Sequence, residues 1–369
     1  MSTSSWTVTH DFAYEVGGAE RVTRAIAEDV LDGAPIRYVG GDASVLSLLG
    51  LTDAAQLRHG LPVSSRTFQA LTPLYPRALG RLAPIEGNVL ASSYAFAHHV
   101  PCTGAKVVYC HSPLRQVWSG AERYLSEGRL PEVLAIRAFG ARLKERDLDA
   151  ARSAKAYIAS GPIVRERIME VYGLEDVPIV PPPVADVFRP PEHDRRRELE
   201  GTGGHYLWVG RITEPYKQLG ITLRAFSRLP ATRLVVVGDG RDRQRLEAEA
   251  PSNVEFVGVL SGGDLAEAYQ SARALIFPSE DDFGMVPIEA MASGTPTIAF
   301  AAGGALHTVE DGITGLFFGE QGADAIVDAV ERFEAARWDR AVIVQRGSRY
   351  RMEHFVEQMR RELERVERP

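Results

Sequence analysis

The chain has 369 residues, 45% of them hydrophobic and 25% charged, with a formal net charge of −7, as expected for a soluble globular protein of two domains. Residues 1–180 carry 19 Lys and Arg against 19 Asp and Glu, and residues 181–369 carry 23 against 30, so the basic surplus of a nucleic-acid-binding protein is lacking. No run of about 18 apolar residues is present, and Cys102 and Cys110 are too few for a disulfide framework. The first five residues lack the basic and apolar parts of a signal peptide, so we expect a cytoplasmic protein.

The first half of the chain alternates strand-like apolar runs with helical patterns. A Gly17-Gly18 loop lies between a strand expected over 5–9 and a helix expected over 21–31. Such a loop in an open α/β sheet can bind a ligand, but a Gly-Gly pair by itself favours a simple turn. Another expected strand, 106–110, leads into His111, which would therefore lie at the ligand-binding carboxyl edge of the sheet. Further strands are expected over 36–40, 88–92 and 156–160.

Three other features of this half have less specific interpretations. Residues 60–84, rich in Arg, Pro and aromatics, are expected to form a pair of solvated helices, with contact to an acceptor or a membrane lipid as the alternative. His98 and His99 are expected on a helix surface. Asp147 and Asp149 lie within a long helical stretch, 130–152, among basic residues; we expect them to be solvated and assign no metal.

A second α/β domain begins after a stiff linker, 178–191, which contains six prolines. The first strand of this domain, 206–210, is followed by Arg211 and Lys217. Two cations at a strand end can neutralise a leaving diphosphate without a metal ion. Later strands are expected over 234–238, 254–258, 274–279 and 297–300.

The most informative stretch runs from residue 274 to 318. A strand is followed by the acidic loop Glu280-Asp-Asp-Phe-Gly284 and by a helix expected over 285–293, which carries Glu289. The N-terminus of a helix offers unpaired N–H groups to phosphates or sugar hydroxyls, and neighbouring carboxylates accept hydrogen bonds from hydroxyls. The stretch therefore favours recognition of a nucleotide or a sugar.

Residues 278–296, together with Gly303-Gly304 and Asp311-Gly-Ile-Thr-Gly315, resemble the donor-site signature of the retaining glycosyltransferases of family 4, particularly the mannosyltransferase-like members. The resemblance implies the GT-B fold, an α/β class with two Rossmann-like α/β/α domains facing across a cleft. The implied domains are 1–183 on the acceptor side and 184–348 on the donor side, with a helix over 349–369 that crosses back to the first domain.

The same resemblance implies a metal-independent hexosyltransferase that needs no cofactor. Its donor would be a nucleotide-diphosphate sugar, and its acceptor a small molecule, a glycan or a lipid-linked hydroxyl, with at most peripheral membrane contact. The implied site residues fall into three groups: Arg211 and Lys217 hold the diphosphate, Glu289 holds the ribose, and Asp281, the backbone of Gly284, Met285 and Val286, and His111 hold the sugar. Gly17 and Gly18 would face the diphosphate and the acceptor.

One position departs from the family signature, which has two glutamates separated by seven residues. Glu289 is the second, but the first position is Asp281. Aspartate is one methylene shorter than glutamate, so the usual contact with the sugar hydroxyl requires a compensating change. Either the loop lies closer to the sugar, or Glu280 takes the place of Asp281, or the donor sugar differs at that hydroxyl. We favour the last alternative. Two other functions remain as alternatives: a non-catalytic nucleotide-sugar-binding protein and a nucleotide-sugar epimerase of the same fold.

Overall fold

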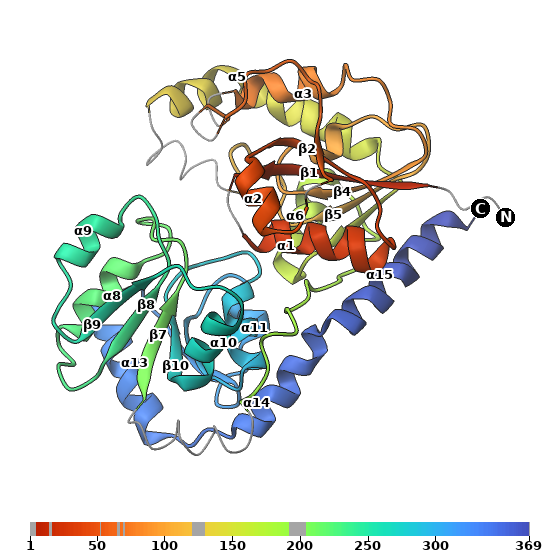
Figure 1. Ribbon diagram of the computed structural model, residues 1–369. Helices are drawn as coiled ribbons and strands as arrows, with labels where there is room; N and C mark the ends of the chain where they lie inside the picture. Colours follow the sequence, from red (N-terminus) through yellow and green to blue (C-terminus); the bar gives the residue numbers. More distant parts are fainter. Residues whose placement is uncertain are drawn as a thin grey trace. The chain divides into compact units, whose positions relative to one another are not determined.

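A computed structural model describes residues 5–14, 17–51, 53–64, 67–68, 71–119, 130–191 and 204–368 (Figure 1). The chain divides into two compact units. Unit 1 comprises Met1–Pro183 and Glu353–Pro369, and unit 2 comprises Val184–Met352. We describe each unit by itself.

Unit 1 is built on a parallel sheet of six strands in the order β3-β2-β1-β4-β5-β6. The strands are β1 (Trp6–Ala13), β2 (Ile36–Gly41), β3 (Ala55–Gln56), β4 (Asn88–Ser93), β5 (Lys106–Cys110) and β6 (Ala156–Ala159). Every residue of β4 and β5 is buried, as expected for central strands of a parallel sheet that is covered on both faces.

The helices of unit 1 pack around this sheet (Figure 1). They are α1 (Gly18–Ala25, followed by one π turn, Ile26–Val30), α2 (Ala43–Leu48), α3 (Tyr75–Leu79), α5 (Leu130–Arg152) and α6 (Pro162–Tyr172). Where a pair of solvated helices was expected over 60–84, the structure has a 3-10 turn, Thr72–Leu74, and the short α3, and Tyr75 is fully buried. Arg66, in the same stretch, lies outside the described residues.

The C-terminal helix α15 (Met352–Glu367) belongs to unit 1 from Glu353 onwards. Its buried residues, Phe355, Met359, Leu363 and Val366, recur every three or four positions and so form one apolar face. Arginine and lysine side chains help hold the helix to unit 1. Arg360 donates to the carbonyl oxygens of Val30 and Asp29 at 3.0 and 2.9 Å, and Lys155 donates to the carbonyl of Val366 at 2.5 Å.

Unit 2 repeats the architecture, with the strand order β12-β11-β10-β7-β8-β9. Its strands are β7 (His205–Val209), β8 (Leu234–Val237), β9 (Val254–Gly258), β10 (Ala272–Phe277), β11 (Thr297–Phe300) and β12 (Gly315–Phe318). Its helices are α8 (Leu219–Phe226), α9 (Arg243–Ala248), α10 (Gly262–Ser271), α11 (Met285–Ala292), α12 (Ala305–Thr308), α13 (Ala323–Ala335) and α14 (Arg340–Gly347).

Side chains alternate between the two faces of the unit 2 sheet, and apolar residues cover both faces. In β10, Leu275 and Phe277 pack into one core cluster, and Ala274 and Ile276 into the other. Strand β10 runs parallel to its neighbours β7 and β11, so the loop that follows it begins at the carboxyl edge of the sheet. Within the described residues, no helix is both long enough and apolar enough to span a membrane.

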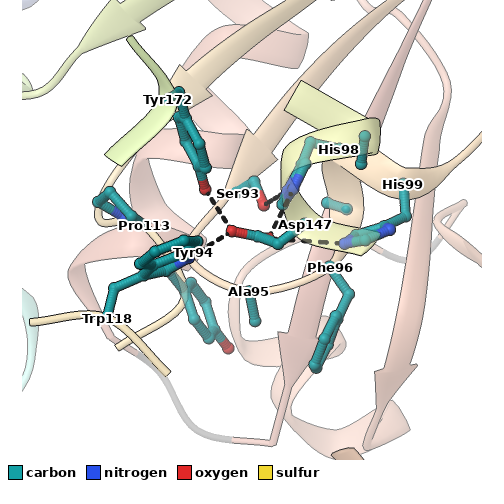
Figure 2. Close-up of polar contacts among 12 residues, drawn as sticks. Ser93, Tyr94, Ala95, Phe96, His98, His99, Pro113, Trp118, Asp147 and Tyr172 are labelled. Carbon is teal, nitrogen blue, oxygen red and sulfur yellow. Dashed lines mark hydrogen bonds and ion pairs between the residues drawn. The ribbon is translucent and has the colours of Figure 1, made fainter. Parts of the chain in front are cut away.

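Asp147 is buried, contrary to the expectation that it is solvated (Figure 2). It shares a stripe of α5 with buried Leu143 and Ala150, whereas its basic neighbours lie on the exposed face. One carboxylate oxygen accepts from His98 at 3.0 Å. The other accepts from Trp118 and Tyr172 at 2.7 and 2.8 Å. The expectation of a solvated aspartate was wrong because the stripe, rather than the local composition, decides burial.

His98 and His99 are also buried, so the expected surface position was wrong. Both rings face Asp147 (Figure 2), and the three side chains could by distance hold a metal ion. The carboxylate already accepts three hydrogen bonds, however, and buried Lys106 donates to the carbonyl of His98 at 2.9 Å. An ammonium so close would repel a divalent ion, and we interpret the cluster as a structural hydrogen-bond network.

Replacing Asp147 by Ala is expected to lower the free energy of unfolding by about 3 to 5 kcal/mol, because buried partners lose their acceptor. Burial alone would raise the pKa of Asp147, but the hydrogen bond from His98 and the nearby His99 ring, 3.6 Å away, hold it well below its usual range. This stabilisation is therefore present above the pKa of an unfolded aspartate and is lost as the pH falls through the depressed value. Urea unfolding at neutral pH measures the change. Asp149→Ala, at an exposed position of the same helix, is the control, and equal effects of the two substitutions would contradict the prediction.

Candidate functional site

The polar loops of unit 2 meet at one edge of its sheet. β7 and β10 are neighbouring parallel strands, so the loops that follow them begin at the same carboxyl edge. The loop after β7 carries Arg211 and Lys217, and the loop after β10 carries Glu280 and Asp281. This is the edge at which open α/β sheets bind ligands.

Lys217 and Asp281 form an ion pair at this edge, although they are 64 residues apart in sequence. The Lys217 ammonium donates to the two carboxylate oxygens of Asp281 at 2.8 and 2.6 Å. Each side chain is 18% exposed, so the pair is held in place yet remains accessible. The structure thus pairs two predicted site residues with each other. Arg211, on the Lys217 loop, is exposed.

The loop after β10 is shaped by glycines. Gly284 has a φ of 86°, a left-handed conformation that favours glycine, and α11 begins at the next residue. A Cβ on Gly304 would lie 2.2 Å from the Phe283 carbonyl oxygen. The Gly304 N–H donates to the carbonyl of Asp281 at 2.7 Å. The Gly303-Gly304 pair therefore lets a second backbone approach the acidic loop and fixes its course.

The first turn of α11 places Met285 and Val286 where backbone N–H groups have no partner within the helix. Glu289, in the second turn, is 5% exposed and accepts a hydrogen bond from the Tyr269 hydroxyl at 2.8 Å. This bond fixes the orientation of the carboxylate. An oriented carboxylate below a helix N-terminus can accept hydrogen bonds from vicinal hydroxyls.

In unit 1, Gly17 and Gly18 begin α1. The Gly17 N–H donates to the Glu20 side chain at 3.0 Å, and Glu20 is itself buried. A Cβ on Gly17 would lie 2.6 Å from that carboxylate oxygen. These contacts describe a capped helix start. The proposed ligand contacts of Gly17 and Gly18 stay predictions.

His111 directly follows β5 and is half-buried. Its Nε2 lies 2.8 Å from the Ser92 hydroxyl. Burial, and to a lesser degree His10, lowers the pKa of His111 to about 3. The imidazole is therefore neutral at physiological pH.

Four residues around His111 were not assigned a role from the sequence: His10, Glu20, Thr23 and Ser92. They belong to β1, α1 and β4 and connect to His111 through short polar contacts. The strand pattern suggested that β1 ends at residue 9, whereas it extends to Ala13, so His10 lies inside the sheet. A polar pair, His10-Asp11, inside a strand next to a Gly-Gly loop is the signal that could have revealed the cluster.

Comparisons with known proteins find similar sequences over part of the chain. The family model "Glycosyl transferases group 1" matches residues 204–335. The D-inositol 3-phosphate glycosyltransferase of Mycobacterium leprae (strain Br4923) is 38% identical over 175 residues, which are 42% of this chain and 40% of that protein. Its counterpart in Mycobacterium tuberculosis (strain H37Ra) is 35% identical over 160 residues, 40% of this chain and 33% of that protein. The chain thus matches less than half the length of these relatives.

Solved structures resemble the chain over nearly its full length. Anabaena Alr3699/HepE in complex with UDP has a TM-score of 0.68 at 17% identity, covering 98% of this chain and 100% of the other. Sucrose-phosphate synthase from Thermosynechococcus elongatus has a TM-score of 0.69 at 18% identity, covering 98% and 99%. At such identities the likeness shows the fold alone. The expected fold class, GT-B with two Rossmann-like α/β/α domains, is confirmed.

Proposed function

We propose that this chain, which carries a domain of the group 1 glycosyl transferases over residues 204–335, is a retaining family 4 enzyme. It would transfer a hexose from a nucleotide-diphosphate sugar to an acceptor hydroxyl without a metal ion. The observation that carries the proposal is the Lys217–Asp281 pair at the carboxyl edge of the unit 2 sheet. In this proposal the lysine would serve the diphosphate and the neighbouring carboxylate a sugar hydroxyl.

The proposed roles follow from the chemistry of the side chains. Lys217 and Arg211 bind the diphosphate and stabilise the negative charge that develops as the sugar leaves. Glu289, oriented by Tyr269, accepts the ribose hydroxyls. Asp281 and the backbone from Gly284 to Val286 hold the sugar. The contact of His111 with the donor sugar rests on the sequence resemblance.

In the proposed reaction the bond between the anomeric carbon and the diphosphate oxygen breaks. A bond from the acceptor oxygen to the same carbon forms on the same face of the sugar. The acceptor proton passes to the departing diphosphate oxygen, so atoms and charge balance without a protein nucleophile. The protein supplies position and electrostatic stabilisation.

The donor class is supported by the names of the structural neighbours, which include complexes with UDP and with UDP-glucose. A thermal-shift series with UDP, GDP and dTDP tests it on this chain. A nucleotide present at 100 times its Kd should stabilise the protein by about 2.7 kcal/mol. Stabilisation by none of the three at millimolar concentration would contradict nucleotide-sugar binding.

Activity is expected to persist in EDTA, because two protein cations rather than a metal ion neutralise the diphosphate in this proposal. The measurement is donor turnover in excess EDTA and after addition of Mg²⁺ or Mn²⁺. Equal rates are the expected result. Loss of activity in EDTA that either ion restores would show that a metal shares the diphosphate site.

A further inference from the structure

A series of hydrogen-bonded hydroxyl and imidazole groups connects α1 to His111 in unit 1. We call this series, which consists of His10, Thr23 and Ser92, the relay. Thr23 Oγ1 lies 2.8 Å from His10 Nδ1 and 2.7 Å from Ser92 Oγ. Ser92 Oγ in turn lies 2.8 Å from His111 Nε2. His10, Thr23 and Ser92 are buried, so bulk water does not compete for these contacts.

The proton positions in the relay follow from two carbonyl oxygens, those of Ala19 and Ser92. Thr23 Oγ1 lies 2.8 Å from the carbonyl of Ala19, which can only accept, so the threonine proton is directed there. His10 Nδ1 lies 3.2 Å from the carbonyl of Ser92, so this nitrogen carries a proton. Thr23 Oγ1 is then an acceptor towards both His10 and Ser92.

The remaining proton assignment has one solution. Because Thr23 accepts, the Ser92 hydroxyl gives its single proton to Thr23. The Ser92 oxygen can then only accept from His111, which requires a proton on His111 Nε2. Reversing any bond sets two acceptors against each other at 2.7 or 2.8 Å.

The other nitrogen of His10 maintains this arrangement. His10 Nε2 is buried, has no hydrogen-bond partner among the described residues and faces a Glu20 carboxylate oxygen at 3.6 Å. Burial lowers the pKa of His10, but Glu20 and, more weakly, Asp11 and the Ser92 carbonyl raise it, and the net effect is upward. The upward shift favours the proton that the Ser92 carbonyl already requires on Nδ1. A charge on His10 also disfavours a second proton on His111.

We propose that His10, Thr23 and Ser92 are positioning residues that fix His111 as the neutral Nε2–H tautomer, so that Nδ1 is a permanent hydrogen-bond acceptor. Nδ1 makes no hydrogen bond to the described part of the chain. His111 would therefore accept a hydrogen bond from a hydroxyl and would not protonate a phosphate oxygen. Only the assignment of that hydroxyl to a sugar rests on the proposed function.

Nitrogen NMR of the 369-residue protein, labelled with ¹⁵N only at histidine, tests the tautomer directly. His111→Gln identifies the signals by their loss. The expected result at neutral pH is a protonated Nε2 and a non-protonated Nδ1 for His111. A protonated Nδ1, an imidazolium or an exchanging mixture of tautomers would overturn the proposal.

Thr23→Val tests whether the relay, rather than His111 alone, sets the tautomer. Without the threonine acceptor, the Ser92 hydroxyl can donate to His111, so the proton should move to Nδ1. Thr222→Val is the matched control: Thr222 is equally buried and bonds a carbonyl four residues back, but in α8 of unit 2. A Thr23→Val protein with the wild-type tautomer would show that the relay does not act.

An activity measurement separates this proposal from the proposed function. Thr23→Val should reduce kcat/KM for the donor up to about tenfold, the value of one neutral hydrogen bond, and Thr222→Val should not. The predicted tautomer in a protein without transferase activity would uphold the relay and reject the function. An active enzyme with the opposite tautomer would reject the relay alone.

Discussion

Lys217→Ala is expected to lower kcat by about two to three orders of magnitude, as removal of a preorganised charge partner from an active site typically does. The diphosphate would lose its contact with the Lys217 ammonium. In addition, Asp281, only 18% exposed, would lose its counter-ion and would repel the incoming phosphates. The first effect slows the departure of the diphosphate, and the second weakens binding of the donor.

Steady-state turnover of purified protein measures this effect. Arg228→Ala is a matched control, because Arg228 is also a cation of unit 2 paired with an aspartate, Asp324, but 52% exposed. It should leave kcat unchanged, since exposed pairs contribute about 0 to 1 kcal/mol to stability. A Lys217→Ala enzyme with near wild-type kcat and normal folding would remove the lysine from the site.

Asp281→Glu is expected to change the donor preference. We hypothesise that the native donor is a deoxy, amino or otherwise altered hexose, because aspartate stands where the family has glutamate. The longer side chain would lower kcat/KM for that donor by about 10- to 100-fold, the value of a hydrogen bond to a charged group. It would raise kcat/KM for a common hexose donor.

The structure sharpens this prediction by separating the two acidic residues. The Asp281 carboxylate accepts hydrogen bonds from the Lys217 ammonium. Glu280 is exposed instead, and its side-chain stem lies beside Gly303. Donor competition assays on Asp281→Glu, Asp281→Ala and Glu280→Ala distinguish the alternatives. If the first two leave the preference unchanged while Glu280→Ala abolishes activity, Glu280 holds the sugar.

The sequence predicted the central strands because burial on both faces produces continuous apolar runs. The ranges expected for β5 and α5 agree with the structure to the residue. Strand β3, two exposed residues at the sheet edge, has no such pattern and was not expected. The range expected for β1 was too short because His10 and Asp11 interrupt its apolar run. Both side chains are nevertheless buried and have polar partners.

For the candidate site, the sequence indicated which residues belong to the loops but not which residues meet. The partners of Lys217 and Asp147 are determined by packing between segments distant in sequence: 64 residues separate Lys217 from Asp281, and 49 separate His98 from Asp147. Helical periodicity alone could have placed Asp147 inside, because Leu143 and Ala150 lie on the same stripe. Its three donors could not be inferred without the fold.

The central claim, that the chain turns over a nucleotide-diphosphate sugar, is tested most directly without an acceptor. Wild-type protein is incubated with UDP-, GDP- and dTDP-hexoses, and released nucleoside diphosphate is measured, with the Lys217→Ala protein as the blank. We predict slow release from at least one donor, about 100-fold or more faster than in the blank. A protein that a nucleotide stabilises against heat but that releases nothing from any donor would be a nucleotide-sugar binder, contradicting the claim.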